Sequence, residues 1–226
     1  RDLKFSILPL MVLLGIIGII LVYQRDTKSI ILLIITAIVM LFISGMPWKY
    51  IVGIFLVSIV CFGILIMSRP YLKARITTYI NPTSDPSGAS YQLQQSLIAI
   101  GSGGIGGRGL GQSIQKFNFL PEPLGDAIFA VAAEEFGFLG SILIILLFLA
   151  FTLRGFRIGS RAPDQFSRLL VIGIVILISS QSFINIAAML GIVPLTGVPL
   201  LFISHGGTAL LFSLAEVTKI NLSNFL

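Results

Sequence analysis

Six apolar runs dominate this sequence, and several are long enough to cross a lipid bilayer. A helix that spans the hydrocarbon core needs roughly 20 mainly apolar residues. The last run is short and follows a proline-rich approach, so part of it could be re-entrant. Helices satisfy their own backbone polar groups in lipid, and the runs are too long for barrel strands, so we expect an all-α, polytopic helical membrane bundle. Its transmembrane helices should lie at about 5–23, 30–43, 48–67, 127–153, 166–190 and 206–220.

The composition agrees with an integral membrane protein. Hydrophobic residues make up 56% of the 226 residues, charged residues make up 11%, and the mean hydropathy is +1.02. A soluble domain of this length could not keep so apolar a surface in water. The single cysteine, Cys61, excludes a disulfide or a cysteine-based metal site within the chain. We therefore expect one membrane domain over 1–226, in contact with membrane lipids and with no nucleic-acid partner.

Positive charge is concentrated in one short connection between two apolar runs. A single acid, Asp164, accompanies four arginines there: Arg154, Arg157, Arg161 and Arg168. Short arginine-rich connections stay on the cytoplasmic side of a membrane. Alternation of the spans then makes 68–125 an extracytoplasmic loop. Connections this long are uncommon unless they carry a function, so we look for the functional site in this loop.

A glycine-rich run in this loop, GSGGIGGRGLGQSIQK, contains a G-x-G-x-x-G pattern at Gly104, Gly106 and Gly109. A dinucleotide site needs a strand before that pattern, whereas an amphipathic helix is predicted there, which disfavours this interpretation. A flexible hinge is one alternative. The other is an anion-binding concavity built from backbone N–H groups, where Arg108 and Lys116 would suit a phosphate.

Four of the nine acids lie in the stretch LPEPLGDAIFAVAAEEFG. Asp126 directly precedes an apolar helix, where it could be an ordinary N-cap or a general base at the membrane surface. Glu122 stands between two prolines and could face the same site or water. Glu134 and Glu135 lie inside a predicted span, where charge is costly. We expect one of them to bond across the bundle as a structural contact, and the alternative is a direct catalytic role.

Two amide side chains fall on the fifth apolar run, one helical turn apart. They are Gln181 and Asn185. Polar side chains in spanning helices commonly hydrogen-bond to neighbouring helices. We therefore expect a structural role for both.

Three blocks of the sequence resemble the SEDS family of bacterial cell-wall polymerases, the group of FtsW, RodA and SpoVE. They occur in the expected order: YQLQQSLIAIGSGGIGGRGLGQSIQKFNFLPE, D-x-IFAV-x-x-EE-x-G-x-x-G and PLTGVPLLFISHGGTALL. The resemblance covers essentially the whole chain and is slightly closer to the FtsW-like branch. Family members usually have ten transmembrane helices, so the chain, which begins at Arg1, resembles the last six.

The resemblance implies an enzyme, a peptidoglycan glycosyltransferase that joins lipid II outside the cell. It also implies the bacterial cytoplasmic membrane, a class B penicillin-binding protein as partner, and other division or elongation proteins. Two alternatives stay open, namely a transporter that moves lipid II across the membrane and a non-catalytic scaffold. No cofactor is certain, although a divalent cation could take part.

The resemblance also implies particular residues. In the family's motif LPE-x-H-T-D the aspartate is regarded as catalytic, and it matches Asp126, although Leu124 and Gly125 stand where His and Thr are common. The usual S-Y-G-G is S-H-G-G here. The segment QRDTKS at 24–29 departs from the common P-D-L-G-T, and we assign no site role to it. The candidate substrate-binding residues are Glu122, Lys116, Arg108, Gln115 and Ser204.

Overall fold

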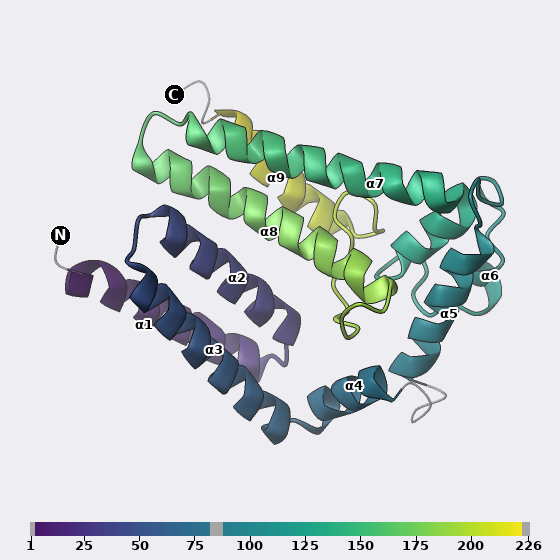
Figure 1. Ribbon diagram of the computed structural model, residues 1–226, viewed down its shortest axis with the longest axis horizontal. Coiled ribbons are helices and arrows are strands. Elements are labelled where there is room, and N and C mark those ends of the chain that lie inside the picture. The colour runs from purple at the N-terminus through teal and green to yellow at the C-terminus, as the bar shows by residue number, and fades with distance from the viewer. Residues whose placement is uncertain (1–2, 82–87, 223–226) are drawn as a thin grey trace.

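The computed structural model describes residues 3–81 and 88–222, and within them all regular structure is helical (Figure 1). The helices are α1 (Leu3–Tyr23), α2 (Thr27–Ile43), α3 (Trp48–Ser68), α4 (Pro70–Ile80), α5 (Ala89–Ser102), α6 (Gln115–Asn118), α7 (Ile128–Ser160), α8 (Gln165–Met189) and α9 (Gly207–Leu222). The all-α membrane bundle predicted from the apolar runs is therefore confirmed.

Within the described ranges, three helices, α3, α7 and α8, are long and apolar enough to cross a membrane. The apolar helical stretches Met11–Tyr23 and Thr27–Ile43 are shorter, so the exact number of spans stays a prediction. Helix α7 continues to Ser160, beyond the apolar run that ends near residue 153. Its last turns pack closely on α8, because a Cβ atom at Gly155 would lie 2.3 Å from a methyl carbon of Val175.

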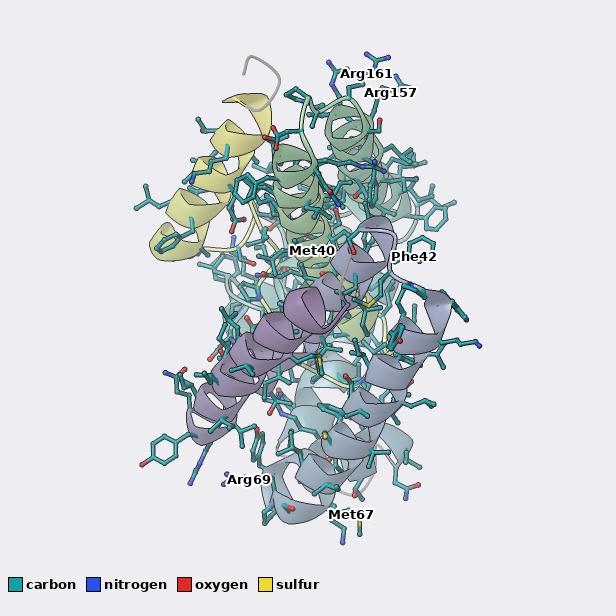
Figure 2. All side chains as sticks on the ribbon, turned by 90° about the vertical axis from the view of Figure 1, so that its left-hand side faces the viewer. Met40, Phe42, Met67, Arg69, Arg157 and Arg161 are labelled. Atoms are coloured by element: carbon teal, nitrogen blue, oxygen red, sulfur yellow. The ribbon has the colours of Figure 1, made fainter. Side chains whose placement is uncertain are left out.

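Helices α7 and α8 run antiparallel and side by side, and α9 contacts both (Figure 1). Helix α2 packs along the other side of α8, and α1 and α3 contact α2. Helices α4 to α6 form a group at one end of this bundle, where α5 packs against α7 (Figure 1). Figure 2 shows Arg157 and Arg161 at the opposite end of the molecule from Arg69. The described parts of the predicted loop 68–125 thus contain three helices, α4 to α6, that cap one end of the bundle.

Helix α7 is interrupted at Gly137, where φ is 66° and ψ is −163°. An unbroken helix would pair the N–H groups of residues 138 and 139 with the carbonyls of 134 and 135. Here those carbonyls accept from Arg108 and Gly109 of the glycine run, at 3.0 Å each. The freed N–H groups of Phe138 and Leu139 donate to the run's carbonyls at 104 and 105. The glycine run therefore satisfies these four groups, as lipid could not.

This pairing explains the glycines and corrects the interpretations of the run. A Cβ atom at Gly107 would lie 2.2 Å from the carbonyl oxygen of Glu135, so only glycine allows the approach. No strand occurs in the part of the chain that the structure describes, which excludes the dinucleotide motif. The anion concavity is also wrong, because the N–H groups at Gly107, Arg108 and Gly109 are bonded to carbonyls. The run packs closely against the α7 backbone and is not a hinge.

Replacing Gly103 with alanine should destabilise the protein by about 1–3 kcal/mol, the usual cost of overpacking. A Cβ atom there would lie 2.1 Å from the carbonyl oxygen of Ala133 on α7. The matched control is Gly101→Ala, in α5, where a Cβ atom meets nothing within 4 Å. This change should be neutral or stabilising by up to about 1 kcal/mol. Thermal unfolding in detergent measures both, and equal effects would contradict the packing argument.

Candidate functional site

Asp126 lies at the capped end of the bundle, in the turn that precedes α7. The structure rejects the N-cap interpretation, because the N-cap position is Ala127 and no side chain caps α7. Among the described residues, no hydrogen bond or ion pair closer than 4 Å engages the Asp126 carboxylate. The side chain is half-buried and available for chemistry.

The backbone around Asp126, in contrast, is firmly held. The Asn185 side chain on α8 donates from Nδ2 to the carbonyl of Asp126 at 2.7 Å and to that of Val198 at 2.6 Å. Ser204 donates from Oγ to the carbonyl of Gly125 at 2.8 Å and accepts from the N–H of Leu200. Asn185 thus ties the Asp126 turn to the segment after α8, and Ser204 acts beside it as a positioning group.

Gln181, one turn earlier on α8, donates to the carbonyl of Pro199 at 3.3 Å. The structural role expected for Gln181 and Asn185 is confirmed, but their partners are non-helical segments and not other spanning helices. These hydrogen bonds from α8 therefore hold the non-helical segment 190–206 in place.

A cavity of about 180 Å³ opens beside the Asp126 carboxylate. Asn185 and Thr196 line it, and their buried oxygen atoms Asn185 Oδ1 and Thr196 Oγ1 have no hydrogen-bond partner among the described residues. Gly197 has a φ of 68°, and a Cβ atom there would lie 3.2 Å from Asp126 Oδ2. Glycine therefore keeps the approach to the carboxylate open. Unpaired buried acceptors in a polar cavity suit a ligand that carries hydroxyl or amide groups.

Burial raises the pKa of the Asp126 carboxyl above its usual range. Lys28 acts against this effect with its positive charge, whereas the Glu122 carboxylate adds to it. Arg75 lowers the pKa by a smaller amount. Asp126 is therefore a stronger base than an exposed aspartate, and Glu122, which lines the same cavity, lies close enough to influence it.

Four of the predicted substrate-binding residues do not line this cavity, namely Arg108, Lys116, Gln115 and Ser204. Ser204 instead bonds to the backbone of Gly125, next to Asp126. Arg108 forms an ion pair with Glu134, with 3.4 Å between Nε and Oε1. Lys116 lies farther from its partner, with 3.9 Å between Nζ and Glu135 Oε1. The fully buried Glu134 carboxylate also accepts from Ser113 Oγ at 2.6 Å, and from the N–H groups of residues 114 and 115. The structural role expected of one of the two glutamates is confirmed for Glu134, but Glu134 bonds to the loop and not across the bundle.

A second, apolar cavity of about 360 Å³ lies next to the first, between α2, α3, α4 and α8. The two share Arg75, Leu195 and Thr196, so they meet along the segment after α8. Its walls are mainly aliphatic side chains, and Lys28 and Arg75 are the charged residues among the described ones that line it. The two cavities together fit a molecule with a polar head and an apolar tail.

Sequence reasoning found the acid of this site but missed Lys28 and Arg75 as its neighbours. Lys28 belongs to QRDTKS, to which no role was assigned, and Arg75 to a basic and aromatic stretch. The available signal was weak. It consisted of two cations in segments predicted to lie at the same membrane surface as Asp126.

Comparison with known proteins shows which family this chain is similar to. The family model described as "Cell cycle protein", for FtsW, RodA and SpoVE, matches residues 1–221. Stage V sporulation protein E of Bacillus subtilis (strain 168) is 43% identical over 203 residues, which are 89% of this chain and 56% of that protein. A probable peptidoglycan glycosyltransferase FtsW of Geobacter sp. (strain M18) is 39% identical over 209 residues, 92% of this chain and 57% of that protein.

Solved structures show the same similarity. A chain from a structure titled as a peptidoglycan synthase complex that coordinates polymerization and crosslinking matches with a TM-score of 0.75 and 26% identity, over 99% of this chain and 62% of that one. A mutant of the rod shape determining protein RodA from Thermus thermophilus matches in fold, with a TM-score of 0.64 and 23% identity, over 100% and 58%. The chain thus spans little more than half the length of the curated relatives that it matches. It belongs to the FtsW/RodA/SpoVE family of cell cycle proteins.

Proposed function

We propose that this chain carries the catalytic carboxylate of a peptidoglycan glycosyltransferase that polymerises lipid II at the outer face of the bacterial cytoplasmic membrane. The observation that carries the proposal is the Asp126 carboxylate, which is free of structural bonds and has a raised pKa. It lies in a polar cavity that adjoins an apolar one. An enzyme that acts on a lipid-linked sugar needs this combination of surfaces.

The proposed reaction gives Asp126 one step. A sugar hydroxyl of one substrate attacks the anomeric carbon of the other, and a new carbon–oxygen bond forms while the bond to the pyrophosphate oxygen breaks. Asp126 accepts the proton of the attacking hydroxyl as general base. Glu122 lines the same cavity and helps to set the pKa of Asp126. No group of three metal-ligating side chains occurs among the described residues, and we derive no step through a divalent cation.

The partners proposed for the protein are lipid II, membrane lipids, a class B penicillin-binding protein and other division or elongation proteins. Support for the penicillin-binding partner is the similarity to a chain of a peptidoglycan synthase complex. Support for lipid II as the substrate comes from relatives that are named as probable peptidoglycan glycosyltransferases. In the full-length protein, fluorescent lipid II separates the alternatives, because a polymerase makes glycan ladders on a gel and a transporter only exchanges lipid between leaflets.

Replacing Asp126 with asparagine in the full-length protein should lower lipid II polymerisation by about 10² to 10⁴, the usual contribution of a general base. The amide keeps the size of the side chain but cannot accept the proton. Since Asp126 does not cap α7, folding and membrane insertion should not change. Glycan ladders measured at matched expression report the loss.

The matched control is Asp164→Asn, at the other end of the bundle. Asp164 caps α8 by accepting from the N–H of Ser167 at 2.8 Å, and asparagine caps helices about as well. This variant should keep full activity. Ladders of normal intensity from Asp126→Asn would contradict the catalytic assignment.

The pH dependence of the reaction should respond to Glu122. A general base must be deprotonated, so activity falls as the pH drops through the raised pKa of Asp126. The Glu122 carboxylate raises this pKa, and Glu122→Gln removes its charge. The acid limb of kcat/KM should therefore move to lower pH. A shift to higher pH, or no shift, would show that Asp126 is not the titrating base.

The proposed orientation places α4 to α6 outside and the α7–α8 connection inside. It rests on the arginines of that connection, two of which appear at one end of the bundle in Figure 2. In a Cys61→Ser background, a cysteine at Lys73 should react with a membrane-impermeant maleimide in intact cells. A cysteine at Arg161 should react only after the membrane is opened. The reverse pattern would overturn the orientation.

A further inference from the structure

Two cations from distant parts of the chain meet on the segment after α8. Lys28, at the start of α2, donates from Nζ to the carbonyl of Gly197 at 2.9 Å. Arg75, on α4, donates from Nη1 to the carbonyl of Leu195 at 3.1 Å. Both carbonyls belong to the stretch that separates the apolar cavity from the Asp126 cavity. The pair therefore lies at the junction of the two cavities.

A separate contact holds α4 against the start of α2. The Tyr71 hydroxyl on α4 is hydrogen-bonded to the Thr27 hydroxyl and donates to the carbonyl of Arg25 at 3.2 Å. Thr27 precedes Lys28 directly, and Tyr71 is one helical turn before Arg75. This contact fixes the two helices that carry the cations relative to each other.

Most of the donor groups of this pair remain available. A lysine ammonium has three N–H donors and an arginine guanidinium has five, and the structure uses one of each in a hydrogen bond. Among the described residues, neither cation has an acidic group within ion-pair distance, whereas Arg108 and Lys116 do. Lys28 is also exposed and accessible to a ligand.

The surroundings define the ligand that this pair would bind. On one side lies an apolar cavity to which the described residues contribute two charged side chains, Lys28 and Arg75. On the other lies the cavity of Asp126, where no described residue forms a hydrogen bond with buried Asn185 Oδ1 or Thr196 Oγ1. An anionic group at the junction would have an apolar chain attached on one side and a hydroxyl-bearing group on the other. A lipid pyrophosphate joined to a sugar has this arrangement.

We propose that Lys28 and Arg75 bind the pyrophosphate of the lipid-linked sugar substrate and stabilise it as it leaves. This inference rests on the proposed function and assigns the cationic role for which the sequence suggested Arg108 and Lys116. Groups that carry charge and multiple donors stabilise the negative charge that develops on a departing phosphate oxygen. The lipid chain would enter the apolar cavity, and the sugar would face Asp126.

The test measures binding without turnover. Full-length protein with Asp126→Asn is placed in nanodiscs, and its affinities for a polyprenyl pyrophosphate and for the uncharged polyprenol are compared. Lys28→Met should weaken pyrophosphate binding about 10- to 100-fold, as expected for a lost hydrogen bond to a charged group. Polyprenol binding should not change. Lys28→Arg should restore most of the affinity, since it keeps the charge.

Lys73→Met is the matched control. It removes the same charge from α4, two residues before Arg75, at a residue that lines neither cavity. It should leave both affinities unchanged. Arg75→Gln is a second variant, and it should lose affinity for the pyrophosphate only. Equal losses for both lipids in the Lys28 and Arg75 variants would show a purely structural role and overturn the inference, as would unchanged pyrophosphate binding.

The two proposals fail in different ways. In one case the wild-type protein makes glycan ladders, but Lys28→Met does not weaken binding of the polyprenyl pyrophosphate. This result would reject the inference and leave the proposed function standing. Pyrophosphate binding that depends on Lys28, in a wild-type protein that makes no ladders, would reject the polymerase and support the lipid pyrophosphate site.

Discussion

The exchange of hydrogen bonds at the break in α7 is the constraint on which the capped end of the molecule depends. A helix interrupted near lipid must find partners for its freed backbone groups, and the glycine run provides partners for those of residues 134, 135, 138 and 139. The same contact buries Glu134, whose charge is compensated by Arg108 and by donors from residues 113–115. Arg108 and Lys116 therefore stabilise the contact between the glycine run and α7. An anionic ligand would have to be bound by other cations.

Asp126 is held by its backbone and not by its side chain. Asn185 fixes its carbonyl to α8, and Ser204 fixes the carbonyl before it. The carboxylate can therefore remain without a protein partner while its position is well defined, which a general base needs because small displacements spoil a reaction geometry. Burial of the same group raises its pKa and so increases its strength as a base.

Local patterns predicted the helices and the acid, but not the neighbours of that acid. Long apolar runs identify membrane helices because lipid leaves the backbone few choices, and Asp126 stood out because acids are rare in such a chain. Lys28 and Arg75 could not be placed, since they meet Gly197 and Leu195 only through packing of segments 120 or more residues away. The glycine run was misread for the same reason. Its composition indicated conformational freedom. The glycines are required instead by the close approach of the α7 backbone, which would lie 2.2 Å from a Cβ atom added at Gly107.

The two cations also connect substrate binding to the basicity of Asp126. The positive charges of Lys28 and Arg75 lower the pKa of that carboxyl and so oppose the effect of burial. A pyrophosphate bound between them would offset those charges, and the attached sugar would exclude more water from the cavity. Both changes disfavour the ionised carboxylate and raise its affinity for a proton. Asp126 would then be the strongest base when the substrate is in place, and departure of the pyrophosphate would restore the lower pKa and favour release of the proton.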